Sequence, residues 1–131
     1  MEPADRPILI VEDDPVIAEH VRAVLKDQGN ASVHWAADAE TALSAALEAP
    51  PSIAFLDVRL PGGIDGITVG RELRQKYGTT LIFVTGSLDD AVRQMADPGV
   101  FFIGKPFRDH EIIEMLTLVT AFERQTAGSG S

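Results

Sequence analysis

The chain has 131 residues and a formal net charge of -9, because 20 acidic side chains outnumber 11 lysines and arginines. This length predicts a single domain with one core, and the acidic excess argues against direct nucleic-acid binding, which depends on Lys and Arg contacts to phosphate. The chain has no Cys, which excludes disulfides, thiolate metal sites and Cys nucleophiles.

The two ends of the sequence predict short extensions of a globular domain. The first apolar run, over residues 8–11, is followed by three acids and is too short for a signal peptide or a membrane span. We expect residues 1–6 to be an N-terminal extension, residues 7–125 to form the domain and residues 126–131 to be a disordered tail of linker composition. The absence of Cys fits a reducing compartment, and we expect the protein to be cytoplasmic.

In the first half of the chain, short apolar runs alternate with amphipathic segments. The predicted elements are a strand at 8–11 (ILIV), a helix from Asp14 to Gly29, a strand at 32–36 (SVHWA), a helix from Asp38 to Pro50 and a strand at 53–56 (IAFL). Asp14 and Asp38 are the predicted N-caps, because a short carboxylate can accept the free N–H groups of a first helical turn.

The second half of the chain repeats this alternation. The predicted elements are a helix at 66–77, a strand at 81–84 (LIFV), a short polar helix at 88–96, a strand at 100–103 (VFFI) and a long helix at 109–125. Strands that are apolar on all sides and joined by helices indicate a parallel sheet with helices on both faces. The predicted fold is α/β, a doubly wound (βα)5 domain with five parallel strands in the order 2-1-3-4-5.

Polar side chains stand where the predicted strands end. Glu12 and Asp13 follow the first strand, Asp57 the third, Thr85 the fourth and Lys105 the fifth. Because the carboxyl ends of parallel strands lie along one edge, where doubly wound folds bind ligands, we expect these residues to meet in one cleft. Neighbouring carboxylates raise one another's pKa unless a cation intervenes, and an all-oxygen donor set favours Mg²⁺.

This set of groups is what phosphoryl transfer to a carboxylate requires. Asp57 is the predicted nucleophile, because it lies in mid-sheet and the turn residues PGGIDG (61–66) hold the crevice open behind it. A cation and the Lys105 ammonium can neutralise the equatorial phosphoryl oxygens, and the Thr85 hydroxyl can support one of them.

Four motifs, taken in order, resemble the receiver domain of two-component response regulators. They are VEDDP at 11–15, FLDVRLPGGIDG at 55–66, FVTG at 83–86 and GKPF at 104–107, and the resemblance extends from about residue 7 to residue 124. It implies a flavodoxin-like sheet and a signalling domain that a histidine kinase or a phosphotransfer protein phosphorylates with the help of Mg²⁺. The domain would catalyse only its own phosphorylation and dephosphorylation.

The resemblance assigns the acceptor and the metal ligands. Asp57 matches the phosphoacceptor and is also a metal ligand. Glu12 and Asp13 match the acidic pair that holds Mg²⁺, with Asp13 as the direct ligand and Glu12 acting through water. The backbone carbonyl of Arg59 matches the third protein ligand, so the Arg59 side chain is free to vary.

The resemblance also assigns a conformational switch. Thr85 matches the switch hydroxyl, Lys105 the lysine beside the phosphoryl group, and Phe102 the aromatic residue that swings inward when Thr85 moves. Pro106 matches a proline whose preceding peptide bond is usually cis. A plain core position remains an alternative for Phe102, because the run VFFI would bury aromatic side chains in any case.

Two departures from the family pattern affect what is expected. The loop after Asp57 is roughly one residue longer than usual, and Gly86 stands after Thr85 where the family usually has Ala. FVTG therefore resembles in part the FAT-GUY subgroup, often stand-alone proteins that work with HWE-type kinases, although Ser87 stands where that subgroup has an aromatic residue. The chain is expected to be a stand-alone regulator or the receiver of a longer protein.

The last predicted helix, 109–125, has a wide apolar stripe that fits either a deeply buried helix or a surface for a second copy or an output protein.

Two other functions share a related fold. A haloacid dehalogenase-type phosphohydrolase would need an acid two residues after the nucleophile, where this chain has Arg59. A flavodoxin-like FMN-binding protein would need a Ser- and Thr-rich phosphate loop after the first strand, where this chain has three acids. A receiver locked in one state would not need the full set of site residues.

Overall fold

A computed structural model describes residues 6–86 and 95–129 of the chain. Its strands are β1 (Ile8–Val11), β2 (Val33–Ala36), β3 (Ile53–Leu56), β4 (Thr80–Thr85) and β5 (Val100–Gly104), and its helices are α1 (Pro15–Asp27), α2 (Ala39–Glu48), α3 (Gly66–Tyr77) and α5 (Asp109–Ser129). All strand pairs are parallel, and the strands lie in the order β2-β1-β3-β4-β5. The predicted fold class and strand order are confirmed.

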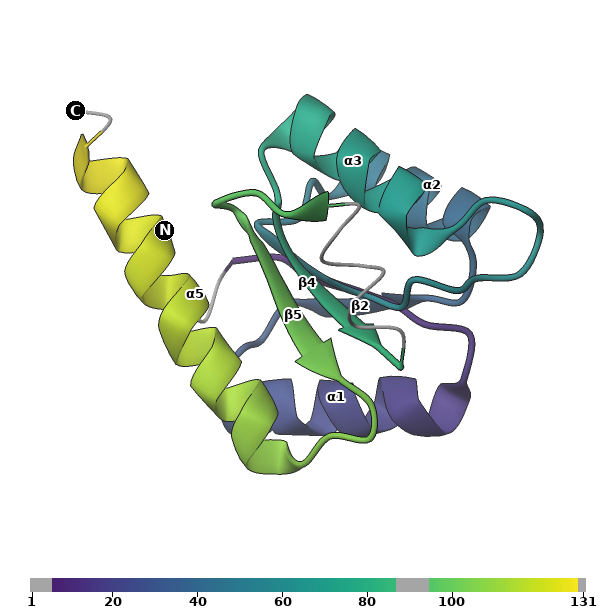
Figure 1. Cartoon of the computed structure of the whole chain (residues 1–131), viewed down its shortest axis with the longest axis horizontal. Helices are drawn as coiled ribbons and strands as arrows, with labels where there is room; N and C mark the ends of the chain where they lie inside the picture. Colours follow the sequence, from purple (N-terminus) through teal and green to yellow (C-terminus); the bar gives the residue numbers. More distant parts are fainter. Residues whose placement is uncertain (1–5, 87–94, 130–131) are drawn as a thin grey trace.

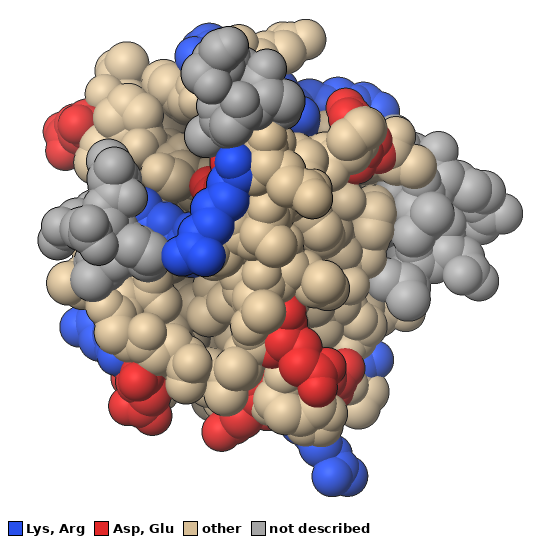
Figure 2. Space-filling model, turned by 90° about the vertical axis from the view of Figure 1, so that its left-hand side faces the viewer, with Lys and Arg blue, Asp and Glu red and all other residues tan. Residues whose placement is uncertain are grey.

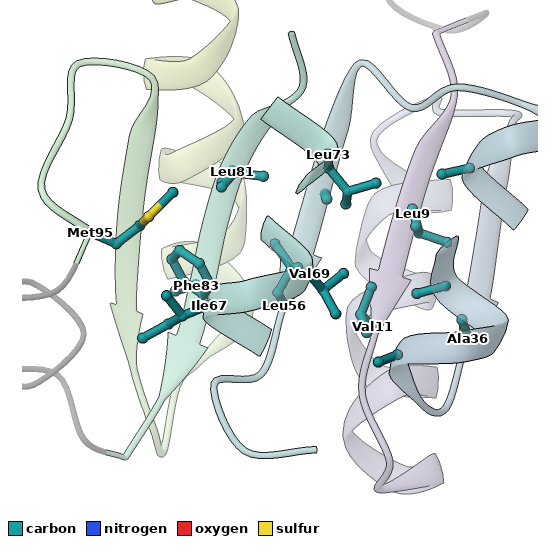
Figure 3. Close-up of a cluster of buried hydrophobic side chains, with 14 of the residues drawn as sticks. Leu9, Val11, Ala36, Leu56, Ile67, Val69, Leu73, Leu81, Phe83 and Met95 are labelled. Atoms are coloured by element: carbon teal, nitrogen blue, oxygen red, sulfur yellow. The ribbon is translucent and has the colours of Figure 1, made fainter. Parts of the chain in front are cut away.

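The helices cover both faces of the sheet, with α1 and α5 on one face and α2 and α3 on the other (Figure 1). Successive side chains of a strand point to opposite faces. Leu9 and Val11 of β1 therefore pack toward α2 and α3, in the core drawn in Figure 3, whereas Ile8 and Ile10 pack toward α1 and α5. This two-sided burial explains why β1 and β3 are apolar throughout and why the four residues between Thr80 and Thr85 of β4 are apolar as well.

Aspartates cap the three helices that follow β1, β2 and β3. The carboxylates of Asp14, Asp38 and Asp65 accept main-chain N–H groups two or three residues further on, at 2.8–2.9 Å. The first two caps were predicted from the sequence, and Asp65 is a third. Because these carboxylates serve the helix termini, they are separate from the acidic side chains that form the candidate site.

The N-terminal segment is joined to the domain one residue earlier than predicted. Arg6, expected in the extension, is buried, and its guanidinium pairs with the Glu123 carboxylate and donates to Thr120 Oγ1 at 3.0 Å. Burial raises the pKa of Glu123, and the neighbouring Arg6 opposes that shift. This ion pair between the buried Arg6 and the half-buried Glu123 joins the chain before β1 to the last helix.

Helix α5 extends beyond its predicted end at Gln125. It continues to Ser129, so residues 126–129 are helical where a disordered tail was expected. Within this extension, the Thr126 hydroxyl donates to the Phe122 carbonyl at 2.9 Å. The predicted helix at 88–96 falls mainly on residues 87–94, which lie outside the described residues. In the part of the chain that is described, no helix combines the length and hydrophobicity that crossing a bilayer requires.

The core of α3 yields a matched stability test. Leu73→Ala removes a fully buried side chain from the core of Figure 3, and we expect it to lower the free energy of unfolding by about 2–5 kcal/mol. Leu47→Ala changes a side chain that is 75% exposed on α2, and the expected loss is below about 0.5 kcal/mol. Urea denaturation of both variants checks the difference, and equal losses would contradict this assignment of the core.

Candidate functional site

The site lies at the carboxyl ends of β1, β3 and β4, the three inner strands of the sheet, and of β5, the edge strand next to β4. Asp57 follows β3, which pairs with β1 on one side and β4 on the other. Its N–H donates to the Val11 carbonyl at 2.9 Å, which fixes its main chain against the end of β1. On the other side, Thr85 ends β4 and pairs in register with Gly104, just before Lys105.

Three carboxylates form a cluster at this edge. One ligand oxygen from each of Glu12, Asp13 and Asp57 lies within 4.8 Å of the other two. Glu12 is buried, Asp57 is half-buried and Asp13 is exposed, so the cluster opens to solvent on the Asp13 side. The expected convergence of these acids from two separate strands is confirmed.

Lys105 connects this cluster to the end of β5. Its Nζ donates to Glu12 Oε1 at 3.0 Å and to Asp57 Oδ2 at 3.1 Å. Because β4 lies between β5 and β3, the long Lys105 side chain crosses the end of β4 to reach both carboxylates. The preceding main chain is anchored as well, since Lys105 N–H donates to the Thr85 carbonyl at 2.9 Å.

Burial and these contacts shift two pKa values. Burial raises the pKa of Glu12, and hydrogen bonds from the Asp14 N–H and Lys105 only partly oppose the shift. Burial alone would lower the pKa of Lys105, but the hydrogen bonds and charges of Glu12 and Asp57 outweigh it, so its pKa is raised. The cationic form of Lys105 is therefore favoured, whereas the ionised form of the buried Glu12 carboxylate remains costly.

The two acids after β1 differ in the oxygens that they can offer to an ion. Both oxygens of Glu12 already accept hydrogen bonds, Oε1 from Lys105 and Oε2 from the Asp14 N–H at 3.1 Å. Asp13 is exposed beside them. The division of roles in which Asp13 coordinates an ion directly and Glu12 acts through water stays a prediction, and each of the two acids offers one ligand oxygen to the cluster.

The turn after Asp57 brings a main-chain N–H back to the Asp57 carboxylate. Arg59 N–H donates to Asp57 Oδ1 at 3.1 Å, whereas the Arg59 side chain is exposed. Further along the turn, Gly66 N–H donates to the Val58 carbonyl at 2.7 Å. The oxygens of Asp57 are thus held by one main-chain donor and one ammonium.

The predicted switch residues lie on the β4 and β5 side of the site. Thr85 is buried at the end of β4. Phe102 is half-buried and stacks on Phe83, its register partner, with ring centroids 5.9 Å apart. This packing agrees with a core position and with a switch, so both interpretations stay open. The peptide bond between Lys105 and Pro106 is cis, as predicted.

These observations converge with a comparison to known families. The sequence profile of the response regulator receiver domain matches residues 8–117 of the chain. The chain belongs to this family. The predicted membership and its signalling function are thereby confirmed, and the comparisons favour neither the phosphohydrolase nor the flavin-binding alternative. Receiver domains bind Mg²⁺ at an acidic pocket, and this receiver has an acidic group of that kind.

Individual relatives agree with this result. DNA-binding response regulator MtrA of Mycolicibacterium smegmatis is 34% identical over 108 residues, which cover 81% of this chain and 46% of MtrA. Transcriptional regulatory protein AruR of Pseudomonas aeruginosa is 40% identical over 91 residues, covering 66% of this chain and 36% of AruR. The receiver domain of NtrX from Brucella abortus is 28% identical, with a TM-score of 0.74, and the match covers 86% of this chain and 96% of that one. This receiver spans less than half the length of MtrA and AruR.

Two residues near the site had no functional role in the sequence analysis. A Cβ added to Gly66 would lie 1.8 Å from the Asp57 carbonyl oxygen, so only Gly allows the turn to approach the Asp57 main chain this closely. In the sequence, the pair Asp65-Gly66 was the available signal for this close approach, because it places a residue without a side chain directly after a helix N-cap. Trp35 donates its indole N–H to the Glu12 carbonyl at 2.8 Å, and no sequence pattern indicated this contact.

The close approach of Gly66 predicts an effect on stability. Gly66→Ala forces the turn away from the Asp57 main chain, and we expect the free energy of unfolding to fall by about 1–3 kcal/mol. Gly86→Ala is the matched control, because a Cβ there meets no atom of the described residues within 4 Å. Urea denaturation should separate the two variants, and a tolerant Gly66→Ala would mean that the turn is not held against Asp57.

Proposed function

We propose that this receiver domain accepts a phosphoryl group on Asp57 from a phosphohistidine of a histidine kinase or phosphotransfer protein. An Asp57 carboxylate oxygen forms a bond to phosphorus while the bond from phosphorus to the donor nitrogen breaks, and the imidazole keeps that electron pair. The observation that supports this most strongly is the position of Lys105 Nζ, 3.1 Å from Asp57 Oδ2 at the carboxyl edge of the sheet.

The other groups would act on charge and position. The Lys105 ammonium lies where negative charge would develop on the phosphoryl oxygens, and the Thr85 hydroxyl, at the end of the neighbouring strand, would bond one of them. The Arg59 N–H would keep Asp57 oriented through the bond to its other oxygen. The domain would act on itself only, in its phosphorylation and in the later hydrolysis of the acyl phosphate.

The acidic cluster fits Mg²⁺ by its donor chemistry. Asp13, Asp57 and the backbone carbonyl of Arg59 would hold the ion, with Glu12 acting through water, and all of these donors are oxygens. The bound ion would supply positive charge beside the transferred group. Burial raises the pKa of Glu12, and a cation bound beside this carboxylate would favour its ionised form.

Phosphorylation would change the conformation of Thr85 and Phe102 and so alter a binding surface that includes α5. The apolar stripe of α5 is wider than its buried side, because Leu118 is exposed in addition to the buried Ile112 and Leu116. On the side of the molecule on which α5 lies, Figure 2 shows a broad uncharged area that lies between Lys and Arg side chains on one side and Asp and Glu side chains on the other. An output protein or a second copy of the chain would bind there. The site needs no membrane or nucleic acid, and we place the domain in the cytoplasm with its kinase.

Phosphorylation of Asp57 is directly measurable. With acetyl phosphate and Mg²⁺, the intact mass of the protein should increase by one phosphoryl group, and Asp57→Asn should abolish the increase because the nucleophile is lost. Asp27→Asn, at the far end of α1, is the control and should be phosphorylated like the wild type. Phosphorylation of Asp57→Asn to the same extent would show that another residue is the acceptor.

Metal binding predicts a gain in stability that depends on Asp13. Because Mg²⁺ binds the folded protein, a free concentration about one hundred times its dissociation constant should add about 2.7 kcal/mol to the free energy of unfolding. Asp13→Asn should lose most of this gain, whereas Asp27→Asn should keep it. Urea denaturation with and without Mg²⁺ measures the difference. Equal gains in both variants would remove Asp13 from the ligand set.

A further inference from the structure

The turn that carries Glu12 and Asp13 begins where the pairing of β1 with β2 ends. The register pairs Val11 with Ala36, the last residue of β2, and Glu12 N–H donates to the Ala36 carbonyl at 3.1 Å. Beyond this point the chain after β2 turns into α2, which Asp38 caps. The Glu12 carbonyl points to the same side as the Glu12 N–H, which is the side of β2. Since β2 has already ended at Ala36, this carbonyl lies beyond the strand pairing.

The indole of Trp35 bonds this carbonyl. Trp35 Nε1 donates to the Glu12 carbonyl oxygen at 2.8 Å, from the residue before the end of β2. Core packing does not explain the placement, because the Trp35 side chain is 46% exposed on an edge strand. An exposed indole can donate to water instead, so the direct bond to Glu12 is a specific feature of this side chain.

The bonded carbonyl belongs to the peptide unit that joins Glu12 to Asp13. A peptide unit is planar, so holding its oxygen limits the rotation that would swing Asp13 away from Asp57. On the other side of the turn, the Glu12 carboxylate is held by the Asp14 N–H and by Lys105. The indole thus adds an outer restraint to a turn that is already held from inside.

We propose that Trp35 is a positioning residue that fixes the Glu12–Asp13 peptide unit and so preorganises Asp13 for a divalent cation. This inference rests on the proposed function, because it concerns the same metal site. Ordering an exposed side chain on binding costs conformational entropy, and a turn fixed beforehand lowers that cost. Loss of the indole N–H should therefore weaken metal binding without changing phosphoryl transfer once the metal is bound.

The test is metal affinity in Trp35→Phe, which keeps an aromatic ring but removes the donor. We would titrate the protein with Mn²⁺ and measure free Mn²⁺ by electron paramagnetic resonance. The dissociation constant should rise by about threefold to tenfold, the range expected for one net hydrogen bond. Leu47→Ala, an exposed apolar change on α2, should bind Mn²⁺ like the wild type. At saturating metal, the phosphorylation rate of Trp35→Phe should stay within about twofold of the wild type.

The outcomes separate a positioning role from a purely structural one. A lower melting temperature of metal-free Trp35→Phe with an unchanged dissociation constant would overturn the inference, as would an equal rise in Leu47→Ala. A wild type that binds no Mn²⁺ would overturn the proposed metal site together with this inference. If the wild type binds Mn²⁺ and Trp35→Phe binds it with the same dissociation constant, this inference alone is overturned.

A second measurement has its main readout in the native protein, and Asp13→Asn serves only as its control. Trp35 is the only Trp of the chain, so its indole N–H gives one identifiable resonance. Addition of Mg²⁺ should shift this resonance in the wild type, because the bonded carbonyl lies in the turn that binds the ion. The shift should be absent in Asp13→Asn. A wild-type resonance that does not move at saturating Mg²⁺ would overturn the inference.

Discussion

The ammonium of Lys105 lies between two carboxylates that the fold brings to the same edge, 3.0 Å from Glu12 and 3.1 Å from Asp57. Without a cation, these acids would repel each other in a partly buried site. The positive charge of Lys105 therefore reduces the repulsion between Glu12, which follows β1, and Asp57, which follows β3. The cost is not fully offset, since the pKa of Glu12 remains raised, and this is the electrostatic basis for expecting a divalent cation.

Because the sheet is parallel, a small set of residues is enough to form the site. Each strand delivers its following residue to one edge, so Asp57 in mid-sheet has a strand end on either side. The long Lys105 side chain then connects β5 to acids two and three strands away. Because the site is built at strand ends, its main-chain geometry is fixed by the sheet and only its side chains and turns can adjust.

The turns around the acids are restrained in different ways. The turn after Asp57 approaches the Asp57 main chain at Gly66, where no side chain fits, and the Arg59 N–H of this turn donates to the Asp57 carboxylate. The turn after β1 is held by the Glu12 carboxylate inside and by the Trp35 indole outside. Asp13 is the acid left exposed, and it is the one whose position depends most on how firmly its turn is held.

The sequence by itself determined the alternation of strands and helices, the parallel fold and the acids, hydroxyl and lysine at the strand ends, because burial on both faces and helix capping leave local patterns. Tertiary structure decided what depends on contacts between distant segments. Arg6 reaches Glu123, Trp35 reaches Glu12, and Gly66 meets the Asp57 carbonyl. The end of α5 at Ser129 was also missed, because a Gly- and Ser-rich composition predicts a linker even where helical hydrogen bonding continues. Local patterns record what each segment buries, but they do not record which donor meets which acceptor across the fold.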